Sequence, residues 1–264
     1  MERGFLLAST FCFLLGLAYT MYALGARHFR PSKFNLGVIA AGFVFQSVFL
    51  YLRGQKVGAC PVTNLFEVLI FLSWAVVLLY LVVGPAYRLS LLGAFTSPMV
   101  FVFQLFALLA QPAIDRPALM TTVRAHHSPL LELHAALSVM AYGAFALGCV
   151  AGVMYLVQER QLKSHKLHSI FFRLPPIHDL AAAIARLIFA GFALLTTGLF
   201  AGFLIGVPML KVVIGETVWT AYAAILVAEW MKKISPRRVA IFSVAAFAFA
   251  LATLSGLNLM GGGY

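Results

Sequence analysis

The chain has 264 residues, of which 62% are hydrophobic and only 10% are charged. A soluble domain usually carries about a quarter charged residues, so this composition excludes an ordinary globular protein. The formal net charge of +11 would suit a nucleic-acid-binding protein, but the basic residues lie between long apolar runs, where Lys and Arg act as topology signals at a lipid surface. We therefore expect membrane lipids, and no nucleic acid, as partners.

The apolar runs predict an all-α, polytopic membrane protein with about eight transmembrane helices. They are rich in Leu, Ala and Phe and do not alternate with polar residues, which favours helices over a β-barrel. Each span needs about 20 apolar residues, so eight helices and short loops use the whole length. The expected helices are Phe5–Leu24, Leu36–Leu52, Asn64–Val83, Leu91–Ala110, Pro129–Val157, His178–Ile205, Glu216–Met231 and Val239–Leu259.

Lys and Arg residues are distributed unevenly between the connections. The connections after the first, third, fifth and seventh helices hold 12 of them, whereas the N-terminus and the remaining connections hold 6. Cytoplasmic loops of membrane proteins are enriched in Lys and Arg. We therefore expect a multi-pass protein of the bacterial cytoplasmic (inner) membrane with both termini outside.

Ionisable side chains inside the predicted spans are candidates for function, because they are costly in lipid. We take Glu67, His134, Arg186 and Glu229 as the candidates. Glu67 also fits a helix cap, since Asn64 stands three residues before it. Arg186 lies about two turns from a helix end and could extend to the interface. Glu229 could pair with a lysine three or four residues further on.

His134 is the strongest of these candidates. It lies just over one turn inside the outer end of the fifth helix, with Ser138 and Tyr142 at i+4 and i+8 on the same face. A neutral imidazole is an axial ligand of haem iron, and the membrane edge suits a porphyrin with apolar rings and anionic propionates. The alternative interpretation is an interhelical hydrogen bond.

Other possible ligands carry less specific signals. His126 and His127 are adjacent, so on a helix they would point about 100° apart and could not share one face. The dipeptide Cys60-Pro61 offers a thiolate, but a two-residue motif has little specificity. The sequence contains no Cys-x-x-Cys pair, so we do not expect thiol–disulfide exchange. We assign no catalytic residue and expect no enzymatic activity.

Three regions resemble the cytochrome c assembly family. The first resembles a helix start in CcsA-type members, the second the helix that carries an external haem-ligand histidine, and the third the helix before the family's tryptophan-rich loop. They are Thr63–Trp74, Leu133–Ser138 with Ala141-Tyr142, and Asp179-Leu180 with Arg186–Gly198. The resemblance implies a single integral membrane domain, 1–264, with two variable helices in 1–59 and a cytochrome c assembly-like six-helix core in 60–264.

The sequence departs from the synthases of this family. The connection Pro208–Gly215 has neither the Trp nor the Asp residues of the family's haem-handling loop, and Asn258 stands where Gly-Leu-His is usual. Histidines usual near Ala59 and Glu229 are also missing, so only His134 remains. This pattern resembles the HemX-like and YpjD-like branch, which lacks the tryptophan-rich haem motif.

That branch implies a haem-associated inner-membrane protein that binds or handles haem, or takes part in haem-linked regulation, without ligation activity. The implied cofactor is haem b. His134 would be the axial ligand, with haem iron as the only metal, and Tyr142, Glu67 and Arg186 would also belong to the cofactor site. HemX-like members are associated with control of haem synthesis through glutamyl-tRNA reductase. The implied partners are therefore cytochrome c biogenesis proteins or a haem-biosynthesis enzyme.

Two alternative functions remain open. One is a CcsA-type cytochrome c biogenesis subunit for haem export or ligation, which should keep paired axial ligands and a porphyrin-binding loop. The other is a small-solute transporter of similar hydropathy. Transporters tend to show broken helices at matching positions of two halves, and the sequence shows no such pair.

The distribution of Lys and Arg can be tested by reporter fusions. Alkaline phosphatase fused after Tyr264 should be active, because the enzyme matures only outside the cytoplasm and the C-terminus is predicted to lie there. Green fluorescent protein at the same position should give little fluorescence. The opposite pair of signals would reverse the orientation and every side assignment that depends on it.

Overall fold

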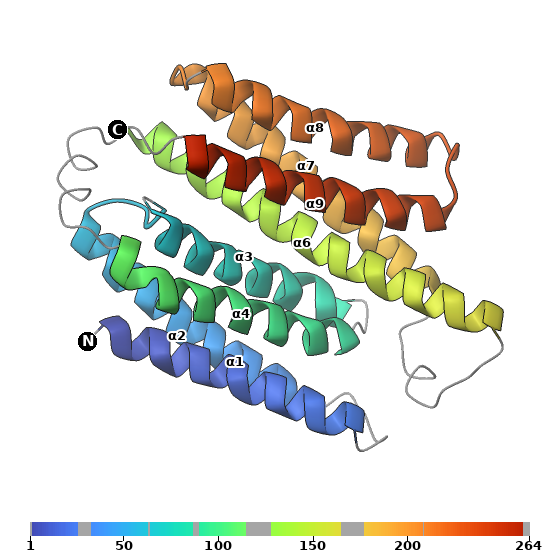
Figure 1. Ribbon diagram of the computed structural model, residues 1–264, viewed down its shortest axis with the longest axis horizontal. Helices are drawn as coiled ribbons and strands as arrows, with labels where there is room; N and C mark the ends of the chain where they lie inside the picture. The colour runs from blue at the N-terminus through green and yellow to red at the C-terminus, as the bar shows by residue number, and fades with distance from the viewer. Residues whose placement is uncertain are drawn as a thin grey trace. The chain divides into compact units, whose positions relative to one another are not determined.

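The computed structural model describes residues 2–25, 33–62, 64–86, 90–114, 128–164, 177–207 and 209–260, and all regular structure within these residues is helical (Figure 1). The helices are α1 (Glu2–Gly25), α2 (Lys33–Val57), α3 (Leu65–Ala86), α4 (Ser90–Ile114), α6 (Pro129–Ser164), α7 (Ile177–Leu204), α8 (Met209–Trp230) and α9 (Pro236–Met260). Seven of them are long and apolar enough to cross a membrane, and α4 contains a shorter apolar stretch, Phe95–Leu109. The prediction of an all-α polytopic membrane protein is confirmed.

Four predicted boundaries were wrong by more than one turn: the ends of α2, α4 and α6 and the start of α8. Helix α4 continues to Ile114 and α6 to Ser164, four and seven residues beyond their expected ends, so the first part of the predicted loop after Val157 is helical. Helix α2 continues to Val57, so Arg53 is helical and does not lie in a connecting loop. Helix α8 begins at Met209, so the predicted loop Pro208–Gly215 is helical from its second residue onward, while Pro208 lies outside the described residues. Five of the six residues between Pro208 and Gly215 are apolar, and none of them is Gly or Pro, so the helix can start early.

Several helix ends have recognisable caps. Gly58 follows α2 at a φ of 77°, and its N–H donates to the Gly54 carbonyl at 2.8 Å. This left-handed conformation is readily adopted by glycine and closes the helix. The turn after α8 uses Lys232 instead, at a φ of 52°. Ser235 and Pro236 then start α9, where Pro at the first helical position needs no N–H partner.

The described helices divide between two compact units. The N-terminal unit contains α1 to α4 and the first turn of α6, up to Glu132. The C-terminal unit contains α6 from Leu133 onward together with α7, α8 and α9. Each unit has its own interior, and the buried polar side chains are concentrated in the N-terminal unit.

The interior of the N-terminal unit combines apolar side chains with many buried polar ones. Of the buried polar or charged residues in the described part of the chain, all but Ser243 belong to this unit: Ser9, Thr10, Thr20, Asn35, Gln46, Arg53, Glu67, Ser73, Thr96, Ser97 and Gln104. Thr10 Oγ1 on α1 donates to Gln104 Oε1 on α4 at 2.8 Å. Gln46 Nε2 on α2 donates to the Ile70 carbonyl on α3 at 2.8 Å. Such interhelical hydrogen bonds hold helices together where lipid supplies no hydrophobic driving force.

The C-terminal unit relies on close contact at small residues. A Cβ atom on Gly191 of α7 would lie 2.5 Å from the ring of Phe145 on α6, and Phe145 stacks on Tyr222 of α8 with centroids 3.6 Å apart. A Cβ atom on Gly152 of α6 would lie 3.1 Å from the Ala240 carbonyl oxygen of α9. These glycines let α6 approach α7 and α9, as small residues do in membrane helix pairs.

A larger side chain at Gly191 should therefore lower stability. In Gly191→Val the new methyl groups would push against Phe145 and disturb its stacking on Tyr222, at a cost of about 1–3 kcal/mol. Thermal unfolding followed by circular dichroism in detergent should show a lower midpoint. Gly37→Ala is the control, because nothing lies within 4 Å of its added Cβ. Equal midpoints for both variants would contradict the close packing at Gly191.

Candidate functional site

His134 makes a hydrogen bond between α6 and α7. Its Nδ1 lies 2.7 Å from the carbonyl oxygen of Gly198. A carbonyl can only accept, so Nδ1 carries the proton and donates, and Nε2 keeps its lone pair. The side chain is half-buried. The interhelical hydrogen bond considered from the sequence is thus present, and it leaves the second ring nitrogen available for ligation.

Two glycines of α7 make room for the imidazole. A Cβ atom on Gly202 would lie 2.7 Å from His134 Nδ1, and one on Gly198 would lie 3.0 Å from Ser138 Oγ. The Ser138 hydroxyl donates to the His134 carbonyl at 2.7 Å. Residues 198 and 202 share a helical face, so this face of α7 accepts the ring. Sequence reasoning missed both glycines, although the spacing Gly-x-x-x-Gly is visible in the chain.

Tyr142 and Arg186 occupy other levels of the C-terminal unit. Tyr142 lies eight residues beyond His134, about 12 Å along α6, and its half-buried side chain lies near Thr253 on α9. Arg186 is exposed on α7, twelve residues before Gly198, which is about 18 Å along the helix. The structure therefore keeps the Arg186 backbone well away from the imidazole.

Glu67 lies in the N-terminal unit and is fully buried. Its N–H donates to Asn64 Oδ1 at 2.9 Å, which confirms the helix cap predicted from the sequence. Its carboxylate accepts from Arg53 Nε at 2.8 Å, and the two side chains are 0% and 3% exposed. Sequence reasoning missed this ion pair because Arg53 was assigned to a loop. The sequence did offer a signal for the pair. It places a carboxylate near the start of one apolar helix and an arginine at the end of the helix before it.

The Arg53–Glu67 pair belongs to a larger charged cluster. Glu2 Oε1 lies 3.7 Å from Arg53 Nη1 and 2.8 Å from Lys56 Nζ. The cluster thus joins the start of α1, the end of α2 and the start of α3. It neutralises charges at one end of the unit, where an isolated charge would be costly.

Cys60 is not suited to thiolate ligation. Burial, reinforced by the nearby carboxylates of Glu132 and Glu67, raises the pKa of its thiol to about 11. The thiol is therefore protonated at neutral pH, whereas the thiolate is the metal-binding form. The Cys60 N–H also donates to Glu132 Oε2 at 3.1 Å, which helps fix this loop.

Among the described residues, the remaining candidates add no metal site. His126 and His127 lie outside the described residues. Within the described ranges, no group of three or more His, Cys, Asp or Glu side chains could hold a metal ion. Glu229 is half-buried and lines a cavity of about 240 Å³ together with His178, at the end of α8 and the start of α7.

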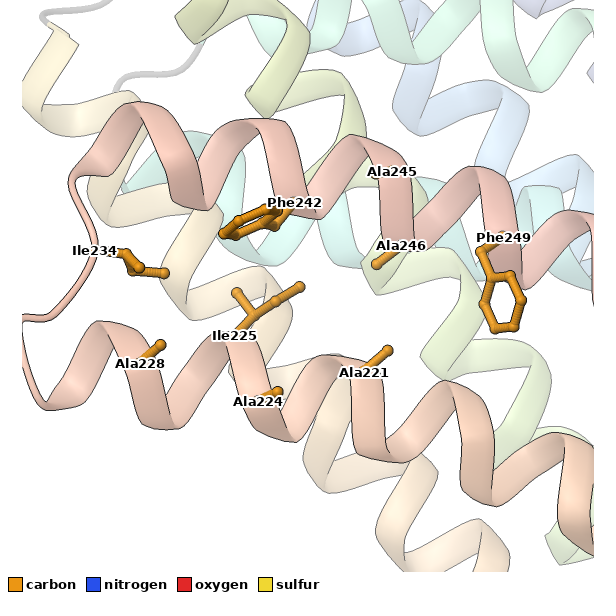
Figure 2. Close-up of a pocket in the computed structure, with 9 residues that line it drawn as sticks. All are labelled: Ala221, Ala224, Ile225, Ala228, Ile234, Phe242, Ala245, Ala246 and Phe249. Carbon is orange, nitrogen blue, oxygen red and sulfur yellow. The ribbon is translucent and has the colours of Figure 1, made fainter.

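An apolar groove of about 530 Å³ lies between α8 and α9 (Figure 2). The residues that line it are Ala221, Ala224, Ile225, Ala228, Ile234, Phe242, Ala245, Ala246 and Phe249. None of these side chains carries a nitrogen, oxygen or sulfur atom. The groove can therefore hold hydrocarbon, but its side chains cannot ligate iron or orient a carboxylate.

Comparison with known proteins assigns the chain to a family. A family model described as "Cytochrome C assembly protein" matches residues 62–264, which is most of the chain. The chain belongs to the cytochrome c assembly family. The matched region includes His134 and the whole C-terminal unit, and it begins after the end of α2.

The similar curated proteins include HemX and CcsA proteins. The chain is 28% identical over 188 residues to Protein HemX from Brevibacillus brevis, covering 71% of this chain and 66% of that protein. It is 28% identical over 245 residues to the cytochrome c biogenesis protein CcsA of Prochlorococcus marinus strain MIT 9303, covering 80% and 77%. With CcsA of Chlorella vulgaris it shares 32% identity over 111 residues, covering 42% and 35%. The matches thus span less than two thirds of HemX and about a third of the Chlorella protein.

The buried ion pair predicts a strong effect of Glu67→Gln on stability. The substitution leaves Arg53 buried without its nearest counter-charge, and breaking such pairs costs about 3–5 kcal/mol. The thermal midpoint in detergent should therefore fall well below that of the native protein. The double variant Arg53→Met/Glu67→Leu, which removes both charges, should recover much of the loss.

Lys56→Gln provides the matched control for this measurement. Lys56 also pairs with a carboxylate, but its side chain is 58% exposed. Exposed pairs contribute at most about 1 kcal/mol, so its midpoint should change little. A loss in Lys56→Gln as large as in Glu67→Gln would show that burial of the Arg53–Glu67 pair is not what matters.

Proposed function

We propose that this protein is a non-catalytic, haem-binding membrane protein in which His134 is an axial ligand of haem b iron. The observation that carries the proposal is the hydrogen bond from Nδ1 to the Gly198 carbonyl. Metal-binding histidines usually donate their other ring N–H to a carbonyl or carboxylate, which fixes the tautomer and raises the basicity of the ligating nitrogen. His134 has this arrangement, with Nε2 as the ligating atom.

The family supports haem as the ligand. Cytochromes c carry haem attached through a Cys-x-x-Cys-His motif, so proteins that assemble them act close to haem chemistry. A bound haem would supply an iron centre that accepts an imidazole. The chain's own residues would hold that imidazole, with Gly198 orienting it and Gly202 leaving space beside it.

The other proposed contacts have polar groups suited to the edge of a porphyrin. Tyr142 supplies a hydroxyl on the same face of α6, and it is the nearest of them along the chain. Arg186 and Glu67 supply a guanidinium and a carboxylate, but Arg186 lies about 18 Å further along α7 and Glu67 belongs to the other unit. Tyr142 and Arg186 remain proposed contacts in that order, whereas the carboxylate of Glu67 is buried and paired with Arg53.

The proposed absence of ligation activity rests on what replaces the porphyrin loop. The segment Met209–Gly215 forms the first turns of α8 and holds no aromatic residue and no carboxylate. Asn258 offers a weak replacement for an imidazole ligand. A CcsA-type role in cytochrome c biogenesis is the second candidate, favoured by the match over 80% of the chain.

The proposal extends to the membrane location, the topology and the partners of the protein. We propose a single integral membrane domain of the bacterial inner membrane, with both termini outside. The partners would be cytochrome c biogenesis proteins or an enzyme of haem biosynthesis, because a haem-binding protein without ligation activity must pass on haem or a signal of its level.

His134→Ala tests this function directly. Protein purified in detergent after haem-replete expression should show a Soret band, and the variant should lose or shift that band because the axial ligand is gone. Gly202→Val should lower the apparent haem affinity by about 10–100-fold, since it displaces the ring that Gly198 orients. Absorption spectra of the oxidised and reduced proteins measure both effects.

His178→Ala is the control for these spectra. Its side chain is 92% exposed at the start of α7, so its removal should leave the Soret band unchanged. Absence of haem from the native protein, or an unchanged spectrum in His134→Ala, would reject the proposal. His134 would then serve only as an interhelical hydrogen-bonding residue.

A further inference from the structure

A charged pocket of about 490 Å³ lies in the C-terminal unit, between the end of α6 and the start of α9. It is lined by Leu156, Glu159, Arg160, Lys163, Arg237 and Ile241. The four α6 residues follow the spacing i, i+3, i+4 and i+7, which places them on one helical face. The two α9 residues are four apart and share a face in the same way. The pocket is therefore built by two facing helix surfaces.

One carboxylate organises the cations of this pocket. Glu159 Oε1 accepts from Lys163 Nζ at 2.7 Å, and Glu159 Oε2 lies 3.2 Å from Arg237 Nε. Glu159 is 17% exposed, whereas Lys163 and Arg237 are 65% and 58% exposed. The carboxylate thus lies beneath two cationic groups that face outward. It fixes their positions and neutralises only one of their charges.

Arg160 adds a third positive charge to the pocket. Its side chain is exposed, and it makes no hydrogen bond or ion pair with another residue in the described part of the chain. Three cations therefore face one anion, which leaves an excess of two positive charges. A pocket with this balance attracts an anionic group, and a guanidinium can bind phosphate oxygens through two hydrogen bonds.

The pocket lies where the apolar parts of three helices end. On α6, exposed Val153 and Val157 precede the charged residues. Helix α8 ends at Trp230, which is 86% exposed, and α9 begins six residues later at Pro236. Exposed Trp residues are enriched at the boundary between lipid and water. The charged groups therefore lie at the level of lipid headgroups, with hydrocarbon on one side.

We propose that this pocket binds the phosphate-bearing headgroup of an anionic phospholipid, such as phosphatidylglycerol. Arg160, Lys163 and Arg237 would contact the phosphate oxygens. Leu156 and Ile241, which is 41% exposed, would contact the first part of an acyl chain. A free phosphate would leave these apolar side chains unused, so a lipid fits the pocket better. Basic pockets between membrane helices bind anionic headgroups in this way.

This site is independent of haem binding and lies on the side predicted to be cytoplasmic. Anionic lipids give the cytoplasmic leaflet its negative surface potential. A lipid held between α6 and α9 would bridge two helices of the C-terminal unit. It would add stability to the protein in anionic membranes and leave the spectrum of any bound haem unchanged.

Titration with short-chain phosphatidylglycerol tests the proposal. The full-length protein in neutral detergent should unfold at a higher temperature as phosphatidylglycerol is added, and native mass spectrometry should show one tightly retained lipid. Phosphatidylcholine and inorganic phosphate at the same concentrations should have little effect. Arg160→Gln should weaken the apparent affinity about fivefold and Arg160→Gln/Arg237→Gln roughly thirtyfold, at about fivefold for each charge removed near an anionic surface.

The control variant is Lys233→Gln/Arg238→Gln. It removes two exposed charges from the same connection and the same helix start, but neither residue lines the pocket. Its affinity should change by no more than about twofold if the pocket geometry determines binding. Arg160→Gln alone keeps the Glu159 ion pairs, so it reports on binding even if the double variant folds poorly.

Three results would overturn the proposal. The control could lose as much affinity as the pocket variants, which would indicate a diffuse charge effect. Phosphatidylcholine could stabilise the protein as strongly as phosphatidylglycerol, which would remove the role of the anionic headgroup. Inorganic phosphate could match the lipid, which would assign the pocket to a soluble anion.

Discussion

Helices in a bilayer are not driven together by the hydrophobic effect, because lipid tails are as apolar as their side chains. Their association depends on close packing and on hydrogen bonds. Both units of this protein pack closely at glycines, and the N-terminal unit adds a larger set of buried polar side chains. In the N-terminal unit, glutamine, serine and threonine side chains bond between helices, as Gln104 and Thr10 do. In the C-terminal unit, glycines such as Gly152 and Gly191 remove the atoms that would keep the helices apart.

The candidate site at His134 depends on close helix packing at glycines. His134 reaches the backbone carbonyl of Gly198 because α7 presents glycine at that position and again one turn later. Any side chain at Gly202 would occupy the place of the ring. The same glycines therefore pack α7 against α6 and orient the imidazole. The proposed iron ligation needs no further residue to orient the His134 ring.

The sequence predicted the helices well because their signal is local. Long apolar runs require helices in lipid, and Asn64 could be recognised as the cap of α3 from a three-residue spacing. The contacts that the sequence did not predict join residues that are far apart in the chain. The pairing of Arg53 with Glu67 crosses a turn whose position was misjudged by five residues, and the contact of His134 with Gly198 joins positions 64 residues apart. The predicted start of α8 at Glu216 was seven residues late, because the helix includes the mainly apolar residues before Gly215.

The buried ion pair also bears on how the chain enters the membrane. An arginine within a helix costs about 2.5–3.5 kcal/mol at the centre of a bilayer, and less near its ends. Arg53 gains its close counter-charge only when Glu67, fourteen residues later, has been synthesised and placed beside it. Helices α2 and α3 therefore gain most by leaving the translocation channel together as a hairpin. The order of synthesis along this stretch is in this sense part of the structural solution, since Arg53 on α2 finds its nearest carboxylate on the helix that follows it.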